Sequence, residues 1–155
     1  MGSDFCPGIW NVLHDATILK ASGAIPQDVV LRLECDYLRD RFKEPGGEFV
    51  LRLVECSRFE FEPWGDAPEV ITDIRLIGSL RLWIRGAQAM EDHCKVDCAR
   101  HVRDAAGGTL RVTTANAELR LDSGRTIPFA EIEEVASDYW TEFSSSKPDE
   151  SGPET

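Results

Sequence analysis

The sequence lacks any apolar run close to the roughly 20 residues that a membrane-spanning helix needs. Residues 1–7 contain neither a basic region nor a long apolar stretch, so no secretory signal peptide is predicted. Basic residues are also scarce, since 17 Lys and Arg face 28 Asp and Glu and leave a net charge of −11. This balance disfavours nucleic acid and anionic membranes as partners, because both are bound through Lys and Arg. It favours basic proteins or cationic ligands, although a need for solubility also explains it.

The familiar signatures of catalysis are missing as well. The sequence contains no Gly-x-Ser-x-Gly elbow, no phosphate-binding loop and no dinucleotide-binding glycine pattern. His14-Asp15 could be a base with its orienting carboxylate. Adjacent residues in a strand point apart, however, so a capping or turn role is favoured. We therefore expect no enzymatic activity and no cofactor.

Cysteine is present but in a pattern that does not favour disulfides or metal. Five cysteines are an odd number in a chain of 155 residues, which is large enough to fold without disulfides. Free thiols and a cytoplasmic location are the simpler expectation. The cluster His93-Cys94, Cys98 and His101 has zinc-binding residue types, but in a flat strand the cysteines and histidines face opposite sides. We expect two buried cysteines, two surface histidines and no bound metal.

Hydrophobic periodicity predicts one α+β domain, mostly β, over residues 1–143. Apolar residues alternate with polar ones over residues 29–37, as in a strand with one buried face. A third strand over 48–62 loses its alternation at Glu55, which either lies in a β-bulge that turns it outward or lines an internal pocket. The bulge is favoured. A long strand or bent pair is predicted over 71–87, and the total is about seven strands in a curved antiparallel sheet or half-barrel.

Two helical segments complete the prediction. A short N-terminal segment has nearly helical apolar spacing and is expected to plug an apolar opening, through Phe5, Ile9, Trp10 and Leu13. Residues 128–143 form an amphipathic helix that follows Pro128, and Trp140 is expected to fill a gap between this helix and the sheet. Residues 144–155 contain Ser, Pro, Gly and acids but no apolar residue, which predicts a disordered acidic tail.

One pattern is typical of a binding surface. Large aromatic residues and arginine dominate binding hot spots, and Trp83 is flanked by Arg81 and Arg85. Trp64, in a loop bounded by proline and glycine, could join them. The alternative, which carries equal weight, is that the helix or the N-terminal segment covers Trp83. With Glu55 as the pocket candidate, the predicted binding residues are Trp83, Arg81, Arg85, Trp64 and Glu55.

Three further strings carry a resemblance to a known group of proteins. They are Trp10-x-x-Leu13-His14-Asp15, the strand that ends Cys35-Asp36-Tyr37-Leu38, and the acidic helix that ends Tyr139-Trp140. Over residues 9–143 the chain loosely resembles small β-rich bacterial proteins of unassigned function, some of which are grouped with the immunity proteins of toxin systems. The resemblance implies an inhibitor that binds a toxin without catalysis, and it assigns no functional residue.

These observations favour a non-catalytic protein-binding domain of the immunity type. The alternative is a small-ligand-binding barrel or half-barrel with a pocket near Glu55, and an enzyme ranks third. The expected partner is a protein, with a basic one favoured by the charge, and a homo-oligomer is compatible with the sequence. Nucleic acid and membrane are not expected as partners.

Overall fold

The computed structural model describes residues 8–65, 69–100 and 107–145 of the chain. Residues 8–12 are helical. The elements that follow are β1 (Thr17–Gly23), β2 (Val29–Glu34), α2 (Asp36–Arg39), β3 (Phe49–Val54), β4 (Arg58–Pro63), α3 (Ile74–Ser79), β5 (Leu82–Ala89), β6 (Cys94–Arg100), β7 (Gly108–Thr113), β8 (Asn116–Leu121), β9 (Thr126–Ile127) and α4 (Phe129–Ser145). Within these ranges, no helix combines the length and the apolar character that crossing a bilayer requires.

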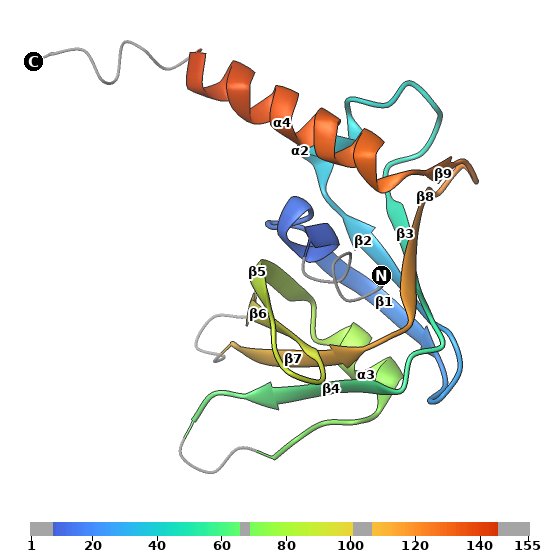
Figure 1. Cartoon of the computed structure of the whole chain (residues 1–155), viewed down its shortest axis with the longest axis vertical. Coiled ribbons are helices and arrows are strands. Elements are labelled where there is room, and N and C mark those ends of the chain that lie inside the picture. The colour runs from blue at the N-terminus through green and yellow to red at the C-terminus, as the bar shows by residue number, and fades with distance from the viewer. Residues whose placement is uncertain (1–7, 66–68, 101–106, 146–155) are drawn as a thin grey trace, which may run out of the picture.

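The described residues form nine strands in one antiparallel sheet, in the order β4-β7-β6-β5-β1-β2-β3-β8-β9. The sheet is open, with β4 and β9 at its edges. It folds into two layers, with β1, β2, β3 and β8 in one and β4 to β7 in the other, and their strands cross steeply (Figure 1). The predicted mostly β, antiparallel character is confirmed. Seven strands were too few, because the predicted strand over 48–62 divides in two and β9 is added.

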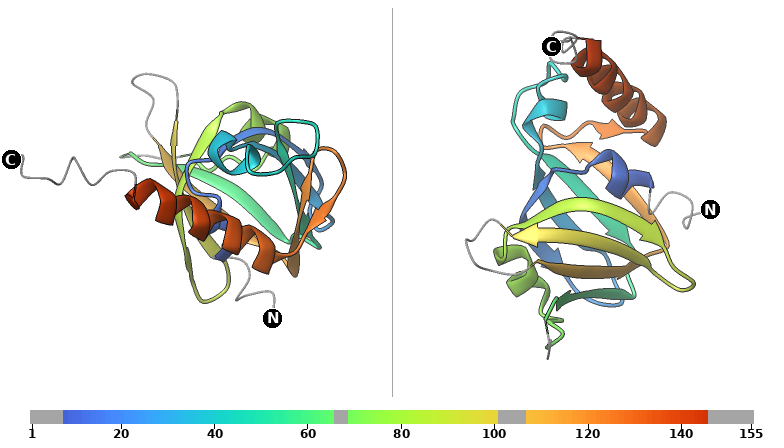
Figure 2. Two further views of the ribbon diagram at one scale, coloured as in Figure 1. Left: turned by 90° about the horizontal axis from the view of Figure 1, so that it is seen from above. Right: turned by 90° about the vertical axis from the view of Figure 1, so that its left-hand side faces the viewer.

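One apolar core fills the space between the layers. Every second residue of the strands points inward, and the largest of these side chains are almost completely buried: Leu31, Leu33, Phe49, Leu51, Phe59, Phe61 and Ile84. The N-terminal helical segment closes one end of this space (Figure 2). Its Ile9, Trp10 and neighbouring Leu13 are fully buried, as the prediction of an apolar plug requires.

A bend at Glu55 carries the chain from one layer to the other. β3 pairs with β8 and β4 pairs with β7, so the two halves of a long strand stay beside the same returning segment. Three residues separate Val54 from Arg58, whereas two separate Thr113 from Asn116, and this excess of one residue defines a β-bulge. Glu55 has a φ of 51° and an exposed side chain. Of the two interpretations of Glu55, the structure has the bulge.

One predicted strand region is a helix instead. α3 begins after Asp73, whose carboxylate accepts a hydrogen bond of 3.2 Å from the Leu76 N–H as an N-cap. Alternation in the strand predicted over 71–87 would bury Leu76 together with Ile74, but the Leu76 side chain is 47% exposed and Ile77 is buried instead. Gly78 lets the helix approach β1, because a Cβ atom there would lie 2.3 Å from the backbone nitrogen of Ala21.

The alternation over residues 29–37 also ends early. β2 stops at Glu34, and the next residues turn into the short helix α2. Tyr37 therefore leaves the inner face of the sheet and packs against α4, with its ring centroid 4.6 Å from that of Tyr139. Its hydroxyl donates a hydrogen bond of 2.9 Å to the carbonyl of His14. The prediction was wrong here because a single turn of helix also places apolar residues on one side.

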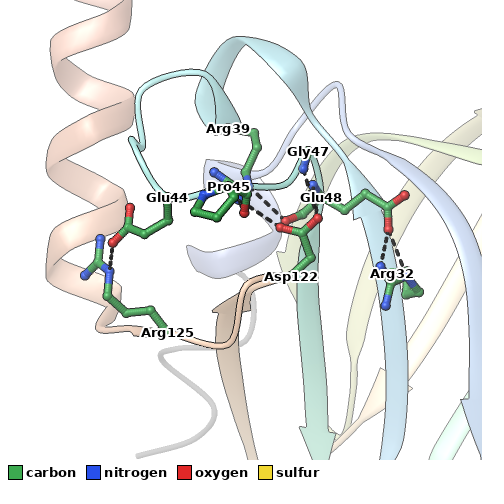
Figure 3. A network of polar contacts seen from close by, with 8 residues as sticks. All are labelled: Arg32, Arg39, Glu44, Pro45, Gly47, Glu48, Asp122 and Arg125. Carbon is green, nitrogen blue, oxygen red and sulfur yellow. Dashed lines mark hydrogen bonds and ion pairs between the residues drawn. The ribbon is translucent and has the colours of Figure 1, made fainter.

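A polar network fixes α2 and the loop after it (Figure 3). The Arg39 side chain is only 2% exposed, and its Nη2 atom donates to Asp122 Oδ1 and to the Pro45 carbonyl, each at 2.8 Å. Its Nε atom donates to the Glu48 carbonyl at 3.1 Å. Asp122 also accepts hydrogen bonds from the N–H groups of Gly47 and Glu48. These bonds join α2, the start of β3 and the turn after β8.

α4 follows Pro128 and continues to Ser145, two residues beyond its predicted end. Ile132 is fully buried and Ala136 is 7% exposed, so the first half of the helix joins the core. The second half extends past the sheet (Figures 1 and 2). Residues 146–155 lie outside the described residues, and with them most of the predicted tail.

Candidate functional site

Four residues that lie in neighbouring strands or directly beside them form a row on the outer face of the sheet. Trp83 of β5 lies opposite Ala99 of β6. In the next pairing Cys98 lies opposite Gly108, which places Gly107 beside Ala99. The backbone N–H of Trp64 then donates a hydrogen bond of 3.0 Å to the Gly107 carbonyl. Paired residues of antiparallel strands project from the same face, so these residues form one line. We call Trp83, Ala99, Gly107 and Trp64 the tryptophan row.

The Trp64 side chain is exposed and is held in a fixed orientation. It is 52% exposed, the highest value among the exposed large hydrophobic residues of the described chain. Its indole N–H donates to Thr109 Oγ1 at 3.1 Å, and Thr109 itself is buried. The ring covers Gly107, where a Cβ atom would lie 3.1 Å from Cζ3 of Trp64 and 2.3 Å from the Cys98 carbonyl oxygen. Glycine is therefore required for this arrangement.

Trp83 stands at the other end of the row. Its neighbours Leu82 and Ile84 are buried, so Trp83 itself faces outward and is half-buried. The guanidinium carbon of Arg85 lies 4.7 Å from its ring centroid, which is cation–π geometry. Arg85 occupies the irregularity of β5 between Ile84 and Gly86. Arg81 precedes the strand with an exposed side chain and a φ of 56°.

The structure therefore brings Trp83, Arg85 and Trp64, three of the five predicted binding residues, to one face of the sheet, and Arg81 lies just before β5. Three strand spacings of about 4.8 Å separate the backbones of Trp83 and Trp64, a span of about 14 Å. Between the two rings, Ala99 presents only a methyl group, and Gly107 lies beneath the Trp64 ring. The row therefore has an aromatic ring at each end, with Arg85 beside Trp83. Aromatic rings and arginine, the residue types that this surface presents among the described residues, are those typical of a binding surface.

The fifth predicted residue, Glu55, lies apart from this face. Its side chain points to solvent at the bend, and the inward neighbours on either side, Leu53 and Phe59, are buried in the core. A surface hollow of about 550 Å³ opens nearby, lined by residues that include Ser57, Arg58 and Asp73 but not Glu55. Glu55 therefore does not line an internal pocket, and the proposed barrel pocket loses the residue that motivated it.

The histidine and cysteine cluster is divided between the two faces of β6. Cys94 and Cys98 are buried in the core, and burial raises the pKa of the Cys98 thiol. His93 lies on the outer side, with Nδ1 2.7 Å from Asp92 Oδ1 and Nε2 3.0 Å from Arg111 Nη1. His101 lies outside the described residues. Among the residues that the structure does describe, no three His, Cys, Asp or Glu side chains are grouped so as to hold a metal ion.

The side chains of His14 and Asp15 do not form a hydrogen bond with each other. The closest side-chain approach is 3.8 Å, from His14 Nε2 to Asp15 Oδ2. The Nδ1 atom of His14 lies 2.9 Å from the carbonyl of Asn11. Asp15 has a φ of 73° in the turn that leads into β1. The pair thus ends the N-terminal helical segment, in keeping with the turn role expected from the sequence.

A second exposed surface, which the sequence did not single out, lies at the end of α4. Tyr139, Trp140 and Phe143 pack against one another there, and Phe143 is 39% exposed. The Trp140 ring stacks on His14 with centroids 5.3 Å apart. Trp140 is half-buried, so it does not fill a gap in the core as predicted. The apolar stripe of the helix was the available signal, but periodicity does not distinguish a buried stripe from an exposed one.

Burial beside this cluster affects two groups that titrate. It raises the pKa of the Cys35 thiol to about 12 and raises the pKa of the Tyr37 hydroxyl. Both groups are therefore neutral at pH 7, and Cys35 is not a thiolate nucleophile.

No protein-family model, curated protein or solved structure matches the chain.

Proposed function

We propose that this chain is a non-catalytic protein-binding domain whose partner docks on the tryptophan row. The observation that carries the proposal is the row itself, in which residues distant in sequence place Trp83 and Trp64 on one open face. Tryptophan and arginine are the residue types most enriched at binding hot spots. An exposed tryptophan that is held rigidly loses little conformational entropy on binding.

The surrounding chemistry supports binding more than catalysis. Both ring nitrogens of His93, the described histidine nearest to the row in sequence, already contact Asp92 and Arg111. The net charge of −11 favours a partner with a basic surface. An immunity-like inhibitor that covers a basic toxin is the finer form of this proposal, and it rests on the resemblance described above.

Photo-crosslinking tests the proposal. The variant Trp64→p-benzoylphenylalanine keeps an aromatic ring in the row, while the matched control Leu76→p-benzoylphenylalanine places the same group on α3. The two wild-type side chains have similar exposure, 52% and 47%. In the cells that produce the protein, we expect one discrete protein adduct from position 64 and none from position 76. The same adduct from both positions, or an adduct from position 76 alone, would contradict docking on the row.

A further inference from the structure

A groove runs between the N-terminal segment and α4, on a surface separate from the tryptophan row. Its volume is about 360 Å³. Val12 on one side and Phe129 and Ala136 on the other supply apolar walls, and the stacked rings of His14 and Trp140 also line the groove. Beyond Trp140 the apolar surface continues to the exposed ring of Phe143. The groove thus provides room for a few apolar side chains along a helix.

The charge around this groove is one-sided. Glu133 lines it, and none of its lining residues is Lys or Arg. α4 as a whole carries five carboxylates and no basic residue. Two of these, Glu131 and Glu142, are paired with arginines. Glu133 and Glu134 have no ion-pair partner in the part of the chain that the structure describes. The unbalanced charge beside the apolar walls defines what the groove can accept.

We propose that this groove binds a basic amphipathic segment of a partner protein. The apolar side chains of the segment would lie between Val12 and Phe129, and a Lys or Arg one turn away would meet Glu133. This is the mode in which an amphipathic helix lies in an apolar groove. An acidic segment is disfavoured by the same carboxylates. The proposal does not depend on the tryptophan row, since the two surfaces share no residue.

A binding experiment with defined peptides tests it. The probe is a synthetic amphipathic peptide of Lys and Leu, and the control peptide has Glu at every Lys position. Calorimetry should detect binding of the Lys peptide to the full chain and none of the Glu peptide. Affinity should fall as salt is raised, because the charge contacts are screened.

Two matched variants separate the groove from the general negative field. Glu133→Lys and Glu134→Lys change the net charge equally on adjacent helix residues, but only Glu133 lines the groove. We expect Glu133→Lys to weaken peptide binding at least about fivefold more than Glu134→Lys, which corresponds to about 1 kcal/mol. Equal weakening by the two variants would overturn the proposal, because the peptide would then be responding to net charge alone.

A third variant fills the groove without removing a contact. Ser137 is exposed and lines the groove, so Ser137→Trp should abolish peptide binding while the thermal unfolding temperature stays close to that of the wild type. Unchanged affinity in this folded variant would also overturn the proposal. Trp64→Ala should leave peptide binding unaltered. A failure of the peptide to bind the groove and a failure of the partner to dock on the tryptophan row can therefore be told apart.

Discussion

The Nη2 atom of Arg39 donates a hydrogen bond of 2.8 Å to Oδ1 of Asp122 and links α2 to the turn after β8 (Figure 3). Because the Arg39 side chain is buried, removing the Asp122 carboxylate leaves the buried guanidinium without a negative charge to pair with. We expect Asp122→Ala to lower the free energy of unfolding by about 3 kcal/mol in urea melts. Glu44→Ala, which breaks the exposed pair with Arg125, should change stability little. Equal effects of the two variants would contradict this assignment.

The same pair predicts a pH dependence. Burial alone would raise the pKa of the Asp122 carboxyl, but the hydrogen bonds from Arg39, Gly47 and Glu48 lower this pKa to about 2. A carboxyl with a lowered pKa stabilises the fold above its unfolded pKa of about 4, and this stabilisation is lost as the pH falls through 2. The stability difference between wild type and Asp122→Asn should therefore be constant from pH 7 to about 5 and shrink below pH 4. A difference that is independent of pH would exclude the ionised pair as its source.

The two halves of α4 should differ in their contribution to stability. Ile132 is fully buried, so Ile132→Ala should cost about 2–5 kcal/mol. Trp140 is half-buried and mainly contacts other rings at the surface. We expect Trp140→Ala to cost about 1–2 kcal/mol, less than a core aromatic residue. If chemical denaturation shows Trp140→Ala to be the more damaging change, then the end of α4 is core and its exposed aromatic surface is misassigned.

The bend at Glu55 gives a prediction with a built-in control. A φ of 51° is unfavourable for a residue with a Cβ atom, and glycine adopts it freely. Both Glu55→Gly and Glu55→Ala keep the hydrogen bond that the backbone N–H of residue 55 donates to the Asp28 carboxylate. Glu55→Gly should therefore raise the free energy of unfolding by up to about 1 kcal/mol relative to Glu55→Ala. A glycine variant no more stable than the alanine variant would show that the bend carries no backbone strain.

Local patterns predicted the elements that depend on one buried face. The break in alternation at Glu55 was enough to indicate a bulge, because a bulge changes which face each residue occupies. The apolar stripe of α4 and the plug at Trp10 followed from helical spacing. α3 was missed because the features that decide it do not show in the alternation of apolar residues. They are the cap at Asp73, which acts locally, and the close approach of the Gly78 backbone to Ala21, which depends on the fold.

The candidate site likewise has parts that neighbouring residues reveal and parts that depend on the fold. Trp83 with its flanking arginines was recognisable from the sequence, since the three residues lie within five positions of the chain at and just before β5. The junction with Trp64 depends on the pairing of β5, β6, β7 and β4, which no local pattern contains. The groove beside Glu133 likewise requires the packing of the N-terminal segment against α4. Surfaces assembled from distant elements are where a single sequence is least informative.

The central claim is that a protein partner docks on the tryptophan row, and its most direct test is a pair of dissociation constants. With the partner identified by crosslinking and purified, binding is measured for wild type, Trp64→Ala and Leu76→Ala. We predict that Trp64→Ala weakens binding at least about tenfold, as expected for a hot-spot residue, and that Leu76→Ala leaves the dissociation constant within about twofold of the wild-type value. Equal dissociation constants for Trp64→Ala and wild type would contradict the claim.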